Sequence, residues 1–265
     1  MTASAAPLAA AGLPDLAPLL TDHPHVLLFA TVSGAHLYGF PSRDSDVDLR
    51  GVHLLPVSAL LGLDRPAETH ARTWDHDGLE SDLVTHDLAK FARLLLRPNG
   101  YVLEQLLSPL VVHSSPTHAE LADLAPGLLT RHHARHYRGF ARTQLRLFER
   151  TGQLKPLLYT FRVLLTGIHL MRAQEVLAHL PSLTQAVGEA PGYLPDLVAA
   201  KETAEHGLLS QADGAPGAER LAADVAALHA VLDRAELETA LPERPTVRAQ
   251  VEELVVGARV ALLPP

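Results

Sequence analysis

The 265-residue chain contains no cysteine. Disulfide bonds and thiolate metal sites are therefore excluded, and the absence fits the reducing cytoplasm, where we expect the protein to act. Uncharged apolar runs of about 18 residues, long enough to span a membrane, are also missing. The apolar N-terminal segment differs from a signal peptide, because no Lys or Arg precedes it and Pro7, Pro14 and Asp15 interrupt it. We therefore expect no contact with a membrane.

Lysine is scarce, since only three of the 22 cationic side chains are lysines. Arginine is preferred where planar, two-pronged contacts to phosphate matter, but a GC-rich genome is the better explanation of the overall ratio. The net charge of −8 argues against a protein coated in nucleic acid. Residues 128–165 are an exception, with a net charge of +7 that leaves −15 for the rest of the chain. This local basic patch indicates one anionic ligand at one place.

Hydrophobic patterns predict strands only in the N-terminal part of the chain. Three segments indicate strands, namely 26–32, 46–54 and 81–85. Helices are predicted at 13–20 and 87–96, whereas 63–79 indicates an irregular loop. From about residue 117 onward every pattern is helical, with helices predicted at 128–150, 156–178, 194–210, 217–236 and 246–260. The sequence thus predicts an α+β fold: a small mixed-sheet domain over 1–115 and an all-helical domain over 116–265.

Two carboxylates lie two residues apart near the start of the second predicted strand. Residues at this spacing face the same side of a strand, so Asp46 and Asp48 would lie side by side. Like charges this close are costly to ionise unless a cation relieves them. Mg²⁺ (or Mn²⁺) prefers such oxygen ligands together with phosphate oxygens, and two ions can activate an attacking oxygen and stabilise a leaving one. An isolated Asp-x-Asp pair is also typical of the solvent face of an edge strand.

A turn containing Gly34 and Gly39 precedes this acidic pair. Glycine permits the backbone to approach a triphosphate closely, and exposed backbone N–H groups in such a turn can bind an anion. The turn therefore favours a nucleotide site over a solvated edge strand.

The stretch 32–52 reads Val-Ser-Gly-Ala-His-Leu-Tyr-Gly-Phe-Pro-Ser-Arg-Asp-Ser-Asp-Val-Asp-Leu-Arg-Gly-Val. It resembles the signature of the polymerase-beta-like nucleotidyltransferase superfamily, which is an apolar strand, Gly-Ser, a spacer and Asp-x-Asp on the next strand. Here ten residues separate Gly34-Ala35 from Asp46-Val47-Asp48. The longer pattern, Ser-Gly-x-x-x-Tyr-Gly-Phe and then Ser-Asp-x-Asp-x-Arg-Gly, is similar to the bacterial branch linked to an RNA-repair polymerase-beta family.

This resemblance implies a metal-dependent enzyme that transfers a nucleoside monophosphate from a nucleoside triphosphate to a hydroxyl and releases pyrophosphate. Asp46, Asp48 and Asp82 would hold the metal ions, with Asp82 as the third carboxylate that acts as base toward the attacking hydroxyl. Glu80 lies on the same face of the third predicted strand and is the competing candidate for that third position.

The chain departs from the family pattern at Ala35, where the family has a serine whose hydroxyl contacts a phosphate. Ser33, Ser42 or Ser45 could compensate, although Ser33 should point the other way on a regular strand. All three carboxylates are present, which favours an active enzyme. We predict nucleotide contacts from Ser33, Gly34, Ala35 and Ser45.

A basic stripe is predicted along one side of a helix, because its six arginines recur every three or four residues. Its members are Arg131, Arg135, Arg138, Arg142, Arg146 and Arg150. An RNA backbone or the triphosphate would be a natural partner, although any single arginine of this kind is also typical of a solvated face. By resemblance, Lys155 and Arg162 would lie on a helix that brings cations to the phosphates, and we expect both to bind the nucleotide.

Some assignments stay open at the level of sequence. Arg50 is equally compatible with binding phosphate and with pairing to Asp48 or Asp82. His132 and His136 have the spacing of two zinc ligands on a helix, but no third ligand is evident, which disfavours zinc.

The acceptor follows from the resemblance and the basic stripe, which together favour an RNA end and a role in RNA repair. A protein side chain or a small molecule such as an aminoglycoside is the alternative acceptor. A further hypothesis is a regulator that binds nucleotide or RNA without chemistry, which Ala35 would favour. The sequence leaves the oligomeric state, the preferred base and the use of a template open.

Overall fold

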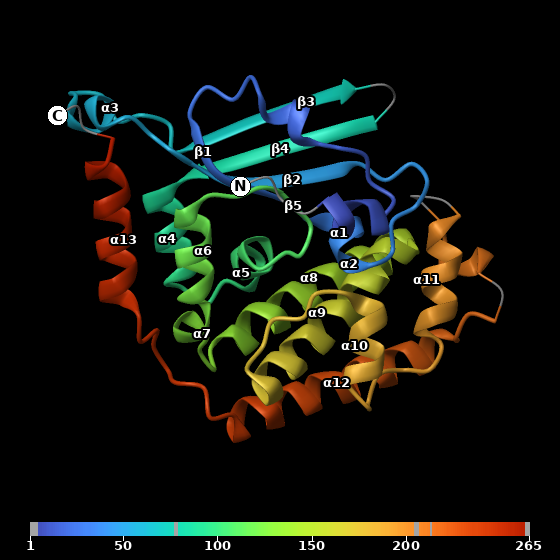
Figure 1. Ribbon diagram of the computed structural model, residues 1–265. Coiled ribbons are helices and arrows are strands. Elements are labelled where there is room, and N and C mark those ends of the chain that lie inside the picture. Colours follow the sequence, from blue (N-terminus) through green and yellow to red (C-terminus); the bar gives the residue numbers. More distant parts are fainter. Residues whose placement is uncertain (1–4, 77–78, 204–206, 213, 263–265) are drawn as a thin grey trace. The chain divides into compact units, whose positions relative to one another are not determined.

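A computed structural model describes residues 5–76, 79–203, 207–212 and 214–262 (Figure 1). By its internal contacts the chain divides into two compact units. Unit 1 comprises Met1–Leu37, Asp46–Leu128 and Pro245–Pro265, and unit 2 comprises Tyr38–Ser45 and Leu129–Arg244. The division into separate domains at about residue 115 stays a prediction. None of the described helices is long and apolar enough to cross a membrane.

Unit 1 is built on a five-stranded mixed sheet in the order β3-β4-β2-β1-β5 (Figure 1). The strands are β1 Val26–Val32, β2 Val47–Leu54, β3 Thr69–His76, β4 Leu79–Asp87 and β5 Val111–His113. β2 runs parallel to β4, whereas β1 pairs antiparallel with β2 and β5, and β3 pairs antiparallel with β4. The predicted mixed sheet is confirmed.

The burial of β1 and β2 follows their sequence patterns. β1 is a continuous apolar run, and its last five residues are buried because the strand lies between two neighbours. In β2 the first four residues alternate, so that Val47 and Leu49 are buried while Asp48 and Arg50 are partly exposed on the opposite face. The alternation at the start of β2 therefore creates a polar face on an otherwise apolar sheet.

Short helices complete unit 1. They are α1 Ala5–Ala10, η1 Ala17–Leu20, α3 Val57–Leu61, α4 Leu88–Leu95, α5 Gly100–Leu106, α6 Pro116–Asp123, α7 Ala125–Leu128 and α13 Arg248–Val260. α2 Gly34–Tyr38 begins in unit 1 and ends at the first residue of unit 2. Proline at the start of α6 and the Ser115 side chain, which accepts a hydrogen bond from His118 N, mark where that helix begins.

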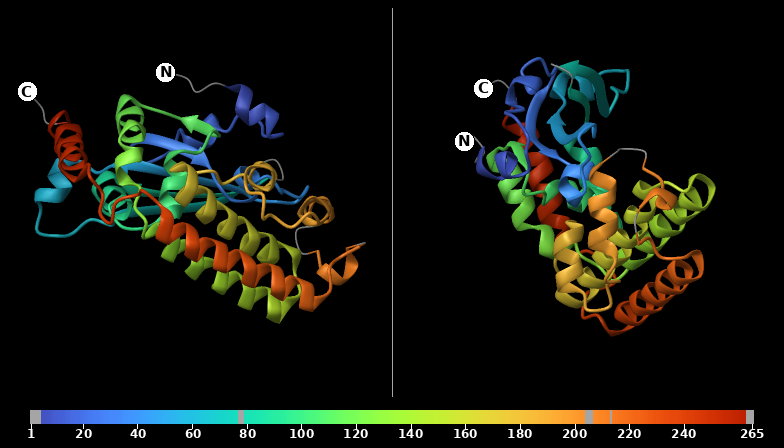
Figure 2. Two further views of the ribbon diagram at one scale, coloured as in Figure 1. Left: turned by 90° about the horizontal axis from the view of Figure 1, so that it is seen from below. Right: turned by 90° about the vertical axis from the view of Figure 1, so that its right-hand side faces the viewer.

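Unit 2 is helical around one buried helix. Its elements are α8 His133–Thr151, α9 Leu154–Ala173, α10 Leu180–Ala186, α11 Leu194–Glu202, η2 Leu209–Gln211 and α12 Ala218–Glu238. α9 is apolar on nearly all sides and is buried along most of its length, with α8, α10, α11 and α12 in contact with it (Figure 2). Gly152 ends α8 in the left-handed conformation, with φ at 67°. The predicted helical region in the C-terminal half is confirmed.

The predicted loop over 63–79 is wrong from Thr69 to His76, which form β3, and at Leu79, where β4 begins; residues 77 and 78 lie outside the described residues. β3 lies at the edge of the sheet, and its described side chains are half-buried or exposed. Periodic apolar residues arise only where one face of a strand is buried, so this edge strand carries no apolar alternation to detect. The short strand β5 and several short helices were missed for a similar reason, since each offers too few residues for a period to show.

Asp87 joins the sheet to two helices of unit 1. Its buried carboxylate accepts hydrogen bonds from Ala89 N at the start of α4, from Leu55 N after β2, and from Arg259 Nη2 of α13, at 3.0, 3.2 and 2.7 Å. Removing the carboxylate leaves the Leu55 N–H without its acceptor and Arg259 without its counter-charge.

We expect Asp87→Ala to lower the free energy of unfolding by about 3 kcal/mol, because a buried charge partner and a helix cap are lost together. Urea denaturation followed by circular dichroism measures this change. Asp123→Ala, at an exposed site on α6, is the matched control and should change stability by less than about 0.5 kcal/mol. Equal stabilities of the two variants would contradict the role given to Asp87.

Candidate active site

The polar face of unit 1 lies at the starts of two parallel strands. In the register of β2 and β4, Asp48 stands directly opposite Asp82. On the other side of β4, Thr73 of β3 stands opposite Asp82. Residues opposite one another in a sheet point to the same face, so the side chains of Asp48, Asp82 and Thr73 form a row across three strands. Two of the three predicted carboxylates are thus neighbours.

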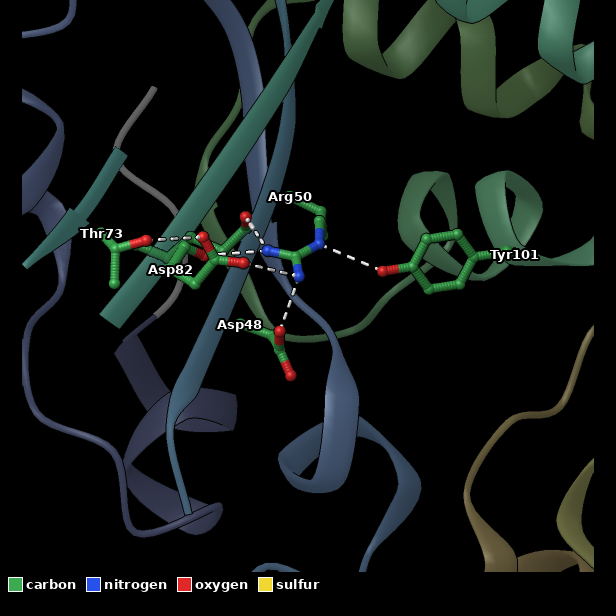
Figure 3. Close-up of polar contacts among 6 residues, drawn as sticks. Asp48, Arg50, Thr73, Asp82 and Tyr101 are labelled. Atoms are coloured by element: carbon green, nitrogen blue, oxygen red, sulfur yellow. Dashed lines mark hydrogen bonds and ion pairs between the residues drawn. The ribbon is translucent and has the colours of Figure 1, made fainter. Parts of the chain in front are cut away.

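Arg50 lies between these two carboxylates (Figure 3). It is two residues after Asp48 on β2 and therefore shares its face. Arg50 Nη2 donates to Asp48 Oδ1 at 2.6 Å and to Asp82 Oδ2 at 3.0 Å. Arg50 Nη1 donates to the carbonyl oxygens of Leu49 and Asp82, both at 2.8 Å, and Nε donates to Tyr101 Oη at 3.1 Å. Arg50 therefore pairs with both carboxylates rather than with one.

The charge of Arg50 is stabilised by this setting. Burial opposes the charged form, but Tyr101, Asp48 and Asp82 outweigh it, so the pKa of Arg50 is raised. The Arg50 side chain is 12% exposed, whereas those of Asp48 and Asp82 are 32% and 36% exposed. The carboxylates thus face solvent more than the cation that joins them.

A second pair of acids lies beside the first. Asp46 directly precedes β2 and is exposed, and Glu80 lies near the start of β4. A hydrogen bond between the two side chains and the repulsion from the Asp46 charge raise the pKa of Glu80. Glu80, the competing candidate for the third carboxylate, is therefore a neighbour of Asp46, whereas Asp82 is the neighbour of Asp48.

Gly34 is required by the position of Asp48. Gly34 has φ at +63°, and a Cβ added there would lie 1.9 Å from Asp48 Oδ2. The carboxylate thus lies directly over the glycine, where a side chain would displace it. Ser33 N also donates to the Asp48 carbonyl oxygen at 2.8 Å, which ties the turn to β2. The glycine turn and the first carboxylate are therefore one structural feature.

The other predicted turn residues are enclosed. Ser33 and Ala35 are buried, and Ser33 Oγ has no hydrogen-bond partner among the described residues. The hydroxyl that the family pattern places after the glycine is replaced here by a buried methyl group. Contacts of Ser33, Gly34 and Ala35 with a nucleotide stay predictions.

Residues 38–45, which form the spacer between the glycine turn and Asp46, belong to unit 2. Ser42 Oγ and Ser45 Oγ are 2.9 Å apart, and Ser42 N donates to Ser45 Oγ at 2.9 Å. Lys201 of α11 is fully buried, and its Nζ donates to Ser42 Oγ at 2.9 Å. Lys201 could not be identified from the sequence, because a single lysine in a helix is usually a solvated residue.

Arg162 holds the beginning of the same spacer. Its side chain is 1% exposed, and its Cζ lies 3.6 Å from the centre of the Tyr38 ring and 5.6 Å from that of Tyr159. A cation over an aromatic face in a buried setting is a favourable contact of about 2 kcal/mol. Lys155 is half-buried on the same helix, α9. Contacts of either cation with a phosphate stay predictions.

The basic stripe is divided by its neighbours in unit 2. Arg138 donates to Asp233 at 2.6 Å and to Glu236 at 2.7 Å on α12. Arg131 donates to the backbone oxygens of Leu237 and Thr239. The C-terminal members of the stripe are exposed on α8, namely Arg142, Arg146 and Arg150. The half of the stripe nearest the start of α8 therefore serves the contact with α12.

The donor chemistry of the acidic face fits a hard divalent cation, because carboxylate oxygens are the ligands that Mg²⁺ prefers. Within the part of the chain that the structure describes, however, three or more metal-binding side chains are nowhere grouped around one point. Arg50 instead occupies one oxygen of Asp48 and one of Asp82.

A glycine turn is followed by acidic residues at the paired starts of two strands within a mixed sheet, and the family match places the chain in the polymerase-beta-like class. The RlaP family, described as the RNA repair pathway DNA polymerase beta family, matches residues 9–257. The chain belongs to this family.

Comparisons with individual proteins give two further matches. An uncharacterized protein of Methanocaldococcus jannaschii is 32% identical over 156 residues, which cover 57% of this chain and 62% of that protein. The match thus spans less than two thirds of that relative. Among solved structures, a nucleotidyltransferase-like protein from Exiguobacterium sibiricum 255-15 is 15% identical, with a TM-score of 0.32 and coverage of 93% of this chain and 89% of that chain.

We expect Gly34→Ala to reduce nucleotidyl transfer by about a hundredfold or more, since the new methyl group displaces the Asp48 carboxylate. The positive φ adds a stability cost of about 1–2 kcal/mol. Pyrophosphate release and thermal unfolding report the two effects separately. Gly188→Ala is the matched control, because an added Cβ there meets nothing within 4 Å. Full activity of the Gly34 variant would refute this account of the turn.

Proposed function

We propose that the protein transfers a nucleoside monophosphate from a nucleoside triphosphate to a hydroxyl at an RNA end and releases pyrophosphate, with Mg²⁺ or Mn²⁺ as cofactor. The observation that carries the proposal is the alignment of Asp48 with Asp82 on adjacent parallel strands, directly beside the Gly34 turn. The family description, which refers to RNA repair, favours RNA as the acceptor.

The carboxylates divide into proposed roles by their neighbours. Asp46 and Asp48 would hold the metal, which when bound neutralises phosphate charge and makes the acceptor hydroxyl more acidic. Asp82 would complete the metal site and accept the hydroxyl proton. Its carboxylate is oriented by Arg50 and by Thr73 Oγ1, which donates to Asp82 Oδ1 at 3.3 Å. Glu80 instead forms a hydrogen bond with Asp46, and this bond and the Asp46 charge raise the pKa of Glu80, which disfavours it for the role proposed for Asp82.

The triphosphate would lie against the Gly34 turn, where a backbone without side chains permits close approach. Ser33, Ala35 and Ser45 remain proposed nucleotide contacts. The backbone N–H groups of Ser33 and Ser45 already donate to the carbonyl oxygens of Asp48 and Ser42, at 2.8 and 3.1 Å, so a phosphate there would compete with these bonds. Lys155 and Arg162 remain the proposed cationic contacts. Of these, the half-buried Lys155 is better exposed to a ligand than the enclosed Arg162.

The first test is pyrophosphate release with each nucleoside triphosphate, Mg²⁺ or Mn²⁺, and a pool of short RNAs. We expect release together with lengthened RNA, and a loss of about a thousandfold or more in the Asp46→Asn/Asp48→Asn variant, since metal-ion stabilisation of transition-state charge amounts to several kcal/mol. Asp123→Asn, an exposed acid on α6, is the control and should retain full activity.

The other outcomes identify the alternatives. Release without lengthened RNA would replace RNA by a protein or small-molecule acceptor. Binding of nucleotide without any release would favour a non-catalytic regulator, with the buried Ala35 as the first feature to revert by Ala35→Ser.

The exposed half of the stripe provides a separate prediction about RNA. Because Arg142, Arg146 and Arg150 are exposed while Arg138 is bonded to α12, we expect RNA binding to depend on the first three. Replacing all three by Gln should reduce the slope of log K against log salt by about 2, which corresponds to three lost contacts with single-stranded phosphates. Fluorescence anisotropy with a labelled short RNA measures this slope.

Arg138→Gln is the matched control for the stripe. It should lower the stability of unit 2, because Asp233 and Glu236 lose their partner, and leave the salt dependence of RNA binding unchanged. If Arg138→Gln alone changed the slope as much as the triple variant, the division of the stripe would be wrong.

A further inference from the structure

Every N–H of the Arg50 guanidinium already has an acceptor. A guanidinium has five N–H donors, one on Nε and two on each Nη. In the structure Nε donates once, Nη1 twice and Nη2 twice, to the Tyr101 hydroxyl, two backbone carbonyls and two carboxylates. Arg50 therefore has no donor to offer a phosphate, and its function lies in the contacts that it already makes.

Those contacts hold two negative charges together. Asp48 and Asp82 face each other across the parallel β2–β4 ladder, where neighbouring strands lie about 4.8 Å apart. Without a cation between them, two carboxylates this close repel each other and oppose the pairing of the strands. Arg50 Nη2 bonds to one oxygen of each, so a single positive charge lies against both negative charges and offsets one of the two.

The guanidinium is also fixed in place from the other side. Two of its five bonds go to the backbone carbonyls of Leu49 and Asp82, which belong to the sheet itself. Figure 3 shows Tyr101 on the opposite side of Arg50 from Asp82, where its hydroxyl accepts the Nε bond. Because the backbone of β2 and β4 holds this guanidinium, its position is set by the sheet and does not depend on a bound substrate.

We propose that Arg50 is the resident counter-ion of the Asp48–Asp82 pair: it fixes both carboxylates before any ligand binds, and it keeps a divalent cation from bridging Asp48 Oδ1 and Asp82 Oδ2. The metal of the proposed function would therefore bind this pair through its other two oxygens. Arg50 is thus a positioning residue for the acidic face. The inference deepens the proposed function, on which it rests for the assignment of that face as the active site. It implies that metal and Arg50 compete for this pair of carboxylates.

The test measures metal binding and stability in the absence of nucleotide. In chelator, Arg50→Met should have a melting temperature several degrees below that of the natural chain, because the two carboxylates lose their counter-charge. Mn²⁺ should recover most of this loss in the variant and shift the natural chain much less. Titration followed by electron paramagnetic resonance should show Mn²⁺ binding at least about tenfold tighter in the variant, because a nearby positive charge is gone.

Two further variants control for charge and geometry. Arg50→Met/Asp48→Asn removes one charge of each sign, so the gain in Mn²⁺ affinity should disappear. Arg50→Lys keeps the charge but offers three donors in place of five, so it should be less stable than the natural chain and show no gain in Mn²⁺ affinity. Should Arg50→Met fail to fold in chelator, its recovery by refolding with Mn²⁺ is the same prediction in stronger form.

Two results would contradict the proposed role of Arg50. Mn²⁺ affinity in Arg50→Met equal to or weaker than that of the natural chain would overturn the proposal. A loss of nucleotide affinity of tenfold or more with unchanged Mn²⁺ binding would make Arg50 a phosphate ligand and overturn it as well. Mn²⁺ affinity is measured without turnover. The role of Arg50 can therefore be tested even if the protein proves not to catalyse the proposed transfer.

Discussion

The parallel pairing of β2 with β4 is the constraint on which the acidic face depends. This register alone places Asp48 opposite Asp82, and a shift of one residue would turn one of the carboxylates to the other face of the sheet. Parallel strands require a crossover, and here the chain between them forms α3 and the edge strand β3. The sheet sets the positions of the two carboxylates. Gly34 leaves room for Asp48, Arg50 pairs with both carboxylates, and Thr73 donates a hydrogen bond to Asp82.

Local sequence was sufficient for the parts of this site that lie close together in the chain. Asp46 and Asp48 could be identified from their spacing, Gly34 from its place before them, and the buried strands from continuous apolar runs. Asp82 could be proposed as the third carboxylate only from the family resemblance, with Glu80 as its competitor. For the other residues and strands the signal is contained within one element and its adjoining turn, which is the range over which periodicity and turn chemistry operate.

What the sequence left open depends on contacts between distant segments. The partners of Arg50 were undecided because Tyr101 and Asp82 reach it from elements 51 and 32 residues away. β3 showed no apolar alternation because an edge strand with exposed faces has none to show. The basic stripe was read as one surface, yet α12 covers part of it with acids whose own sequence gives no hint of that pairing. Burial and ion pairing depend on contacts between distant segments. A sequence pattern therefore indicates them only where they produce a period within one helix or strand.

The membership of residues 38–45 in unit 2 has a consequence for how this protein can be taken apart. The segment lies inside the family signature, flanked by the Gly34 turn and Asp46, yet its partners are Arg162 and Lys201 of the helices. A fragment that ends at residue 128 would contain the entire signature. It would lack the contact of Arg162 with the Tyr38 ring and the hydrogen bond from Lys201 to Ser42. The signature is continuous in sequence, but its middle segment belongs to the helical unit, so the boundaries of the two units fall inside the signature rather than at its ends.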